Sequence, residues 1–514
     1  MRKQDIISLA SLTVLCGACT PQKTPPAKKM NILYIMSDDH SYQTISAYDK
    51  RYINTPNIDR IANEGVRFCN SFVGNSISGP SRAIMLTGKH SHINGFRNNS
   101  DVFDGNQQTY PKLLQKAGYQ TAVVGKWHLT SEPQGFDYWN ILIGQGVYYN
   151  PTFINNGVKE EHEGYATNIT TDIALDWLDN RDQNKPFCLL LHHKAPHRTW
   201  MPDTTDLRLY DDITYPLPDN FYDNYQGRQA AAEQKMSIRE DDMNLVYDLK
   251  MNDEDIHTSN PGLDNAGRHQ YDKMNEAQRK AWDDYYNPII ADFKKSNLKG
   301  EELMNWKFQR YMHDYLRCIH SVDENIGRVL EYLEKNNLLE NTLIVYTSDQ
   351  GFYMGEHGWF DKRFMYEESF RTPLVMRLPG GKKGDVNELV QNIDYAPTML
   401  ELAGVEIPDD IQGKSLLPLL KGEKTQWRDA LYYHYYEFPD EHAVKRHYGC
   451  RDNRYKLIHF YDDIDQWEFF DLEKDPSEMN NLINDPSYKD EILRMKDKLK
   501  ELQVQYNDPI ETKI

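Results

Sequence analysis

The hydrophobic pattern of the chain predicts alternating strands and helices. Four continuous apolar runs of strand length occur, at residues 31–36, 120–124, 186–191 and 342–346. Runs that are apolar at every position are typical of strands buried on both faces of a parallel sheet. Helical patterns lie between them, at residues 112–117, 171–178 and 322–333. The predicted fold class is therefore α/β, a large mostly parallel sheet sandwiched by helices.

The pattern changes twice along the chain. Between about residues 201 and 312 it weakens into charged, Tyr-rich sequence with helical pieces, which indicates an insertion over one face of the sheet. The last hundred residues carry alternating aromatic runs at residues 431–436, 455–460 and 467–470, and then a helical tail at about residues 489–504. We expect a catalytic domain over residues 30–410 and a smaller C-terminal antiparallel-sheet subdomain over residues 411–514.

The N-terminus has the pattern of an export signal. Arg2 and Lys3 precede an apolar run at residues 6–15, and small residues stand before Cys19. This arrangement resembles a bacterial lipoprotein box, which implies a signal peptide at residues 1–18 and a lipid on Cys19. Residues 19–29, rich in Pro and Lys, form a tether. We therefore expect an exported lipoprotein, in the periplasm or at the cell surface.

Composition narrows the class of ligand. The 514-residue chain has a formal net charge of −19, the wrong sign for a nucleic-acid binder or for electrostatic attachment to anionic lipid. An anionic substrate would need a local cluster of cations. The four cysteines after the leader form no C-x-x-C pattern, so a metal site built on cysteine is not expected, and buried free thiols are favoured over disulfides.

Polar side chains follow each of the four apolar strands, at the point where the strand ends. They are Asp38 and Asp39, then Lys126 and His128, then His197, and finally Asp349 and Gln350. The carboxyl ends of parallel strands meet at one edge of a sheet, which is where α/β proteins bind ligands. We therefore expect these side chains to converge.

A fifth segment also carries candidate chemistry. Ser78-Gly79-Pro80-Ser81-Arg82, followed by Leu86-Thr87-Gly88, has the pattern of a helix start, which places Ser78 at the positive end of a helix. Taken alone, Ser78 would be interpreted as a helix N-cap.

Together these motifs, with Gly125-Lys126-Trp127-His128 and Asp394-Tyr395-Ala396-Pro397-Thr398, resemble the type I (formylglycine-dependent) sulfatases of the alkaline phosphatase superfamily. The resemblance implies that a radical maturase oxidises Ser78 to formylglycine, whose hydrate supplies the nucleophile. It also implies a Ca²⁺ site made by Asp38, Asp39, Asp349, Gln350 and residue 78. Gln350 stands where the family more usually has Asn.

The resemblance assigns the remaining catalytic roles. Arg82 and Lys126 would hold the hydrate, while Lys126 and Lys362 would bind the sulfate oxygens. His128 is the expected base, and His197 the expected acid that protonates the departing sugar oxygen.

The segment at residues 355–367, GEHGWFDKRFMYE, is similar to carbohydrate sulfatases of gut bacteria, and the whole chain is most similar to their N-acetylglucosamine-6-O-sulfatases. This implies hydrolysis of the 6-O-sulfate of N-acetylglucosamine in glycosaminoglycan fragments such as heparan sulfate. Asp361, Arg363 and His447 are the expected contacts of the sugar hydroxyls.

Three alternatives remain open at this point. The substrate of a sulfatase could be another sulfated sugar, such as 6-sulfated galactose or N-acetylgalactosamine. A phosphohydrolase of the same superfamily would need ligands for a second metal. A glycan-binding lipoprotein without turnover would follow if Ser78 were never oxidised.

Overall fold

The computed structural model describes residues 29–508. The predicted signal peptide, the lipidation site Cys19 and the tether before residue 29 lie outside the described residues.

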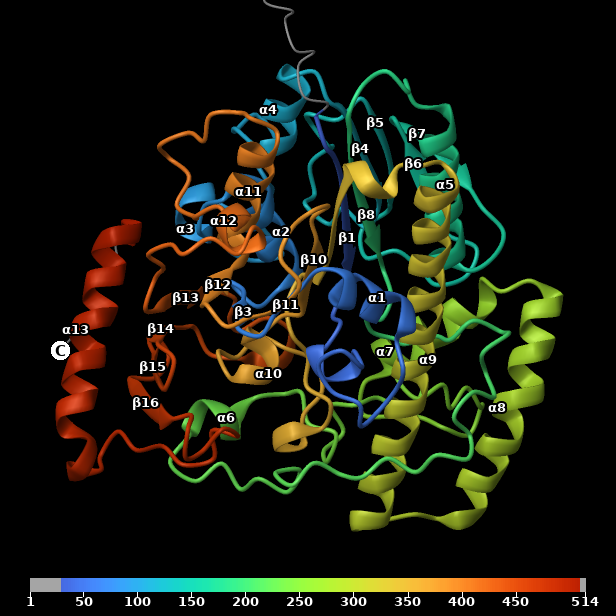
Figure 1. Ribbon diagram of the computed structural model, residues 1–514. Coiled ribbons are helices and arrows are strands. Elements are labelled where there is room, and N and C mark those ends of the chain that lie inside the picture. Colours follow the sequence, from blue (N-terminus) through green and yellow to red (C-terminus); the bar gives the residue numbers. More distant parts are fainter. Residues whose placement is uncertain (1–28, 509–514) are drawn as a thin grey trace, which may run out of the picture.

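A sheet of ten strands forms the centre of the molecule (Figure 1). In spatial order it contains β11 (Gly384–Val386), β2 (Val66–Phe68), β10 (Leu374–Arg377), β9 (Thr342–Ser348), β1 (Asn31–Ser37), β8 (Phe187–His193), β4 (Gln120–Gly125), β5 (Tyr138–Leu142), β6 (Thr152–Asn155) and β7 (Val158–Glu161). The five central strands, from β9 to β5, are mutually parallel, whereas β10, β6 and β7 run antiparallel to their neighbours. The predicted fold class is confirmed.

The four strands predicted from apolar runs are all present and all central. Each extends one or two residues beyond the predicted carboxyl end, to Ser37, Gly125, His193 and Ser348. These extra residues still make ladder hydrogen bonds although their side chains are polar or absent. The polar residues that follow therefore leave the sheet from a shared edge.

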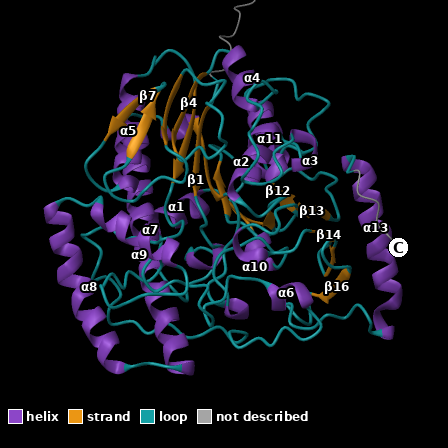
Figure 2. Cartoon of the chain, turned by 180° about the vertical axis from the view of Figure 1, so that it is seen from behind, coloured by secondary structure: helices purple, strands orange, loops and turns teal. Residues whose placement is uncertain are grey.

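Both faces of the sheet are covered, which explains why its central strands are apolar throughout. Along β1, Leu33 and Ile35 belong to one hydrophobic core, while Ile32, Tyr34 and Met36 belong to the other. The first core packs against α1 (Pro56–Glu64), α5 (Ala166–Asn180) and α9 (Gly300–Lys335). The second packs against α2 (Ser78–Thr87), α4 (Tyr110–Lys116), α11 (Tyr395–Leu402) and α12 (Leu417–Leu420). Figure 2 shows the strands between these two groups of helices.

The C-terminal part forms a second, antiparallel sheet. It consists of β13 (Leu431–Tyr435), β14 (His447–Arg451), β15 (Tyr455–Phe460) and β16 (Gln466–Asp471), in that order. The predicted tail helix is α13 (Lys489–Tyr506), and its Met495 and Leu499 pack with Cys450 and Leu457 of the sheet. The aromatic runs predicted three of these strands, whereas β14 was not recognised as a strand.

The predicted insertion packs on the face that carries α9. Its helices are α6 (Gln229–Glu233), α7 (Pro261–Asp272) and α8 (Glu276–Ser296), and it ends in the first turns of α9. The short elements α3 (Ser91–Asn94), α10 (Glu367–Phe370), β3 (Ser71–Phe72) and β12 (Val390–Gln391) complete the described chain.

The cysteines of residues 29–508 are free thiols. Cys188, Cys318 and Cys450 are buried and Cys69 is partly exposed, as expected for small apolar side chains. Within the same range, none of the helices has the length and apolar content needed to cross a membrane.

Candidate active site

The residues that follow β1, β4, β8 and β9 meet at one edge of the sheet, because these strands are adjacent and parallel. The close approach of the loops depends on backbone geometry. Gly125, the last residue of β4, has φ +102°, and a Cβ there would lie 1.9 Å from the carbonyl oxygen of His192. Glycine is therefore required at the position that leads into Lys126 and His128.

Ser78 is the first residue of α2 and points toward the carboxylates. Ile77 occupies the N-cap position, and the Ser78 hydroxyl donates a hydrogen bond to Asp38 Oδ1 at 2.9 Å. The interpretation of Ser78 as a simple helix cap is therefore wrong. The helix N-terminus directs the hydroxyl into the polar cluster at the sheet edge.

Three buried carboxylates form the floor of the site, and each contacts a cation. Lys126 Nζ donates to Asp38 Oδ2, and Lys362 Nζ donates to Asp39 Oδ2 at 2.7 Å. The Arg82 guanidinium donates to Asp349 Oδ2 at 3.1 and 3.2 Å. The backbone N–H of Asp39 donates to Asp349 Oδ1 at 3.1 Å, which joins the ends of β1 and β9.

The pKa values of the three carboxylates are shifted in different directions, because burial is combined with a different set of neighbouring charges at each one. Burial, together with the charges of Asp38 and Asp349, raises the pKa of Asp39 to about 8 despite its contact with Lys362. Burial also raises the pKa of Asp349. For Asp38, Lys126 and other cations outweigh burial and hold the pKa well below its ordinary value. Burial and the neighbouring carboxylates thus favour the protonated form of Asp39 and Asp349, whereas the cations favour the ionised form of Asp38.

This donor set fits a hard divalent cation. Ligand atoms of Asp38, Asp39 and His197 lie within 4.8 Å of one another. Gln350 donates from Nε2 to Asp39 Oδ1, while its Oε1 is buried without a hydrogen-bond partner. A cation would satisfy this amide oxygen and remove the repulsion between the carboxylates, and oxygen ligands of this kind suit Ca²⁺ or Mg²⁺.

Two imidazoles face the cluster from the ends of β4 and β8. His128 Nε2 lies 3.1 Å from Gln145 Nε2, and its Nδ1 is buried without a partner. His197 donates from Nδ1 to the carbonyl oxygen of Arg198 at 2.7 Å, while its Nε2 lies 3.7 Å from Asp39 Oδ2. Burial and the nearby charge of Lys126 hold the pKa of each ring well below its ordinary value. Both rings are therefore neutral in this structure at pH 7.

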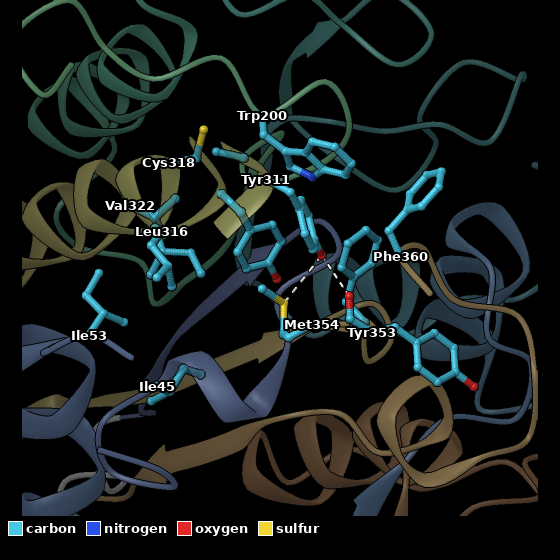
Figure 3. Packing of buried hydrophobic residues seen from close by; sticks show 14 of the residues in the cluster. Ile45, Ile53, Trp200, Tyr311, Leu316, Cys318, Val322, Tyr353, Met354 and Phe360 are labelled. Atoms are coloured by element: carbon cyan, nitrogen blue, oxygen red, sulfur yellow. Dashed lines mark hydrogen bonds between the residues drawn. The ribbon is translucent and has the colours of Figure 1, made fainter. Parts of the chain in front are cut away.

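A buried aromatic cluster fixes the loops that carry His197 and Lys362 (Figure 3). Trp200 and Phe360 have ring centroids 6.0 Å apart, and Trp200 also packs against Tyr311 of α9 at 4.7 Å. The Tyr311 hydroxyl donates to the carbonyl oxygen of Tyr353 at 2.7 Å. The core of the first sheet face thus continues directly under the site.

The three residues predicted to contact the sugar have different surroundings. Asp361 and Arg363 flank Lys362, and Arg363 Nε donates to Asp361 Oδ1 at 3.2 Å. His447 is fully buried in β14, where its Nε2 accepts from the N–H of Met365 at 3.1 Å and its Nδ1 contacts the carbonyl oxygen of Lys445 at 2.8 Å. Both of its ring nitrogens are occupied by backbone groups.

His442, rather than His447, lies beside Asp361. Its Nε2 lies 3.3 Å from Asp361 Oδ2, and the neighbouring Glu441 lies 3.6 Å from Arg363. Glu437 accepts a second hydrogen bond from Arg363. Glu437, Glu441 and His442 belong to the segment between β13 and β14. Nothing in the sequence distinguishes His442 from His447, because both stand in the same polar stretch and neither has a motif.

A cavity of about 920 Å³ adjoins these residues. Its lining includes Arg198, Glu441 and His442 on the side of the site, and Lys235, Arg239 and Asn260 on the side of the insertion. Cavities of this volume accommodate small-molecule ligands.

The comparisons with known proteins agree with this geometry. Residues 30–405 match the family profile described as Sulfatase, and residues 355–505 match that of the N-sulphoglucosamine sulphohydrolase C-terminal region. The chain is 52% identical over 519 residues to an N-acetylglucosamine-6-O-sulfatase of Bacteroides thetaiotaomicron, which covers 98% of this chain and 92% of that protein.

A solved structure and a second relative extend the comparison. A solved structure in complex with its substrate D-glucosamine-2-N,6-O-disulfate superposes with a TM-score of 0.91 and 51% identity, over 94% of this chain and 99% of that chain. An N-acetylglucosamine-6-sulfatase of Bos taurus is 28% identical, over 82% of this chain and 75% of that protein. The chain belongs to the sulfatase family and is a sulfuric ester hydrolase.

Proposed function

We propose that this chain removes the 6-O-sulfate from N-acetylglucosamine or N-sulfated glucosamine at the end of glycosaminoglycan fragments such as heparan sulfate. The observation that carries this proposal is the placement of Asp361, Arg363 and His442 beside the sulfate-binding Lys362. Sugar hydroxyls would lie next to these groups when the sulfate reaches Lys362. The activity of the similar B. thetaiotaomicron protein supports the same substrate class.

The nucleophile depends on a modification of Ser78. We propose that a radical maturase removes two electrons and two protons from the Ser78 side chain, and the hydrated aldehyde then supplies a nucleophilic oxygen. Asp38, Asp39, Asp349 and Gln350 would hold a calcium ion, which supplies positive charge beside the sulfate.

The chain's own cations bind and orient the sulfate group. In the structure, Lys126 and Lys362 are engaged by Asp38 and Asp39. With a metal ion held by these carboxylates, both ammonium groups would be available to donate to sulfate oxygens, where negative charge increases as the ester bond breaks. Arg82 remains anchored by the carbonyl oxygen of Lys126 at 2.8 Å and orients residue 78.

Each of the two imidazoles, His128 and His197, transfers a proton at its Nε2 atom. His128 is neutral because its pKa is well below its ordinary value, and it accepts a proton at Nε2 as the base. His197 keeps its Nδ1–H bonded to the Arg198 carbonyl oxygen, so the neutral ring is unprotonated at Nε2 and must take up the acidic proton there when substrate binds. From Nε2 it protonates the departing sugar oxygen.

We also propose that the protein is exported and anchored through a lipid on Cys19, which lies outside the described residues. The basic start, the short apolar run and the small residues before Cys19 support this. Mass spectrometry of the membrane fraction would test it, since a Cys19→Ala variant should lose the lipid.

Sulfate release tests the proposed function directly. The chain is coexpressed with an oxygen-independent maturase and assayed on 6-sulfated N-acetylglucosamine, glucosamine-2-N,6-O-disulfate, 6-sulfated galactose and 6-sulfated N-acetylgalactosamine. Release from the two glucosamines, lost in Ser78→Ala, is the expected result. Release from the galactose-type sugars alone would replace the proposed substrate. No release despite oxidised Ser78 would favour a glycan-binding protein without turnover.

A further inference from the structure

Lys194 differs from every other buried lysine of residues 29–508. Each of the others has a carboxylate oxygen within 4.0 Å of its ammonium group, whereas Lys194, which is 5% exposed, has none. Its ammonium group lies over the ring of Tyr148, 4.9 Å from the centroid. Removing an ammonium ion from water without a counter-charge is costly, and a cation–π contact offsets only part of that cost. The side chain therefore lacks an anion.

Lys250 is an equally buried lysine of the same protein whose ammonium group has a carboxylate partner. It is also 5% exposed and lies over an aromatic ring, that of Trp200. Unlike Lys194, it contacts Asp314 Oδ2 at 3.0 Å and donates to the carbonyl oxygen of Asp248 at 2.7 Å. The two lysines have matched burial but opposite pairing, so they serve as test and control.

The backbone around Lys194 is tied to the active site on three sides. Lys194 follows the last residue of β8, and its carbonyl oxygen accepts from the N–H of His197 at 3.0 Å. The next carbonyl oxygen, of Ala195, accepts from the N–H of Asp38 at 3.4 Å. The Tyr148 hydroxyl donates to the His197 carbonyl oxygen at 2.6 Å. Lys194 is thus held in one turn with the expected acid and beside an expected metal ligand.

The electrostatic surroundings of Lys194 point to the same cluster. Burial, together with the charge of Lys126, lowers the pKa of Lys194 to about 7, while the charges of Asp38 and Asp39 oppose the shift. The charges that act most strongly on Lys194 are therefore those of the sulfate-binding centre. The anion that completes its environment should enter that centre.

Lys194 differs from the other cations of the centre in its partners. Arg82 and Lys362 each lie within 4.0 Å of two carboxylates, and Lys126 contacts one, that of Asp38. A fourth cation, Lys194, has no carboxylate partner, and a divalent metal ion would add two further positive charges. A bound sulfate group supplies negative charge at this position.

We propose that Lys194 is a further substrate-binding residue that contacts an oxygen of the reacting sulfate group and of the released sulfate ion. This rests on the proposed function, because it requires that a sulfate group enters the site. Lys194 adds positive charge where negative charge increases during ester cleavage. No additional chemical step is involved.

Three variants of the matured, calcium-loaded full chain test this. They are Lys194→Met, Lys194→Arg and the control Lys250→Met. For each, kcat/KM on 6-sulfated N-acetylglucosamine, inhibition by sodium sulfate, and the thermal midpoint in sodium sulfate against sodium chloride at equal ionic strength are measured. Lys194→Gln replaces Lys194→Met if the latter does not fold.

We expect Lys194→Met to lower kcat/KM about 10- to 100-fold and to weaken sulfate inhibition by a similar factor. Its thermal midpoint without sulfate should be equal to or above that of the wild type, since an unpaired buried charge is removed. Lys194→Arg should recover most of the sulfate binding. Lys250→Met should lower the thermal midpoint and leave sulfate inhibition unchanged.

Two results would contradict the proposed role of Lys194, and the measurements distinguish them. A Lys194→Met variant with a lowered midpoint and wild-type sulfate inhibition would assign Lys194 a structural role and overturn the proposal. A loss seen only with N-sulfated substrate would place Lys194 at the amino substituent instead, which also overturns it. The sulfate-induced midpoint shift involves no sugar, so it decides the role of Lys194 even if the proposed substrate is wrong.

Discussion

Arg198, the residue after His197, is bound by two carboxylates of very different exposure. Its Nε and Nη2 donate to the two oxygens of Asp248 at 2.6 and 2.8 Å, and the Asp248 side chain is fully buried. Its Nη1 donates to Glu441 Oε1 at 2.9 Å, and the Glu441 side chain is 56% exposed. One guanidinium group thus links His197 to the insertion and to the C-terminal subdomain.

The two contacts should differ greatly in strength. Asp248→Asn leaves the Arg198 guanidinium buried without its paired charge, and breaking a buried ion pair costs about 3 to 5 kcal/mol. We expect about 3 kcal/mol, the lower end, because Glu441 still neutralises the guanidinium. Glu441→Gln breaks a pair that water screens, so it should cost less than about 1 kcal/mol.

Urea denaturation followed by tryptophan fluorescence measures both losses on one scale. Arg198→Met completes a double-mutant cycle, and the cost of Asp248→Asn should be strongly non-additive with it. Equal losses for Asp248→Asn and Glu441→Gln, or additive losses with Arg198→Met, would refute the argument from burial.

Three further outcomes are expected. Chelation of the divalent cation should lower the thermal midpoint and stop sulfate release, because three buried carboxylates are left to repel one another. Excess calcium should restore both. An unchanged midpoint would argue against the metal site. Burial raises the pKa of Glu468 from 4.5 to about 8, although Tyr366 donates to it, so the folded protein keeps a proton that the unfolded chain releases. The free energy of unfolding should therefore fall as the pH rises from about 4.5 to 8, by up to about 1.4 kcal/mol per pH unit. Glu468→Gln should flatten the curve of thermal midpoint against pH. Parallel curves for the wild type and the variant would contradict this. His442→Ala should raise KM for the sugar through the loss of its contact with Asp361. His447→Ala should mainly lower the thermal midpoint, because His447 is buried in the second sheet. The reverse result would indicate that His447 contacts the sugar.

Much of the fold follows from local pattern. The four apolar runs predicted the central strands because a strand buried on both faces must be apolar at every position, and this property is visible in the sequence. β14 was missed because its sequence, His447 to Arg451, mixes polar residues that its neighbours satisfy. Burial of polar side chains depends on partners, which a run of residues does not reveal.

The sequence by itself determined which side chains end the central strands, and therefore that Asp38, Lys126, His197 and Asp349 meet at one edge. That conclusion needs only the geometry of parallel strands. Only the tertiary structure decided that His442 rather than His447 lies beside Asp361, and that no carboxylate lies beside Lys194. These features depend on how the C-terminal subdomain and the insertion pack against the sheet, and contacts between segments distant in the chain leave no periodic pattern in the sequence.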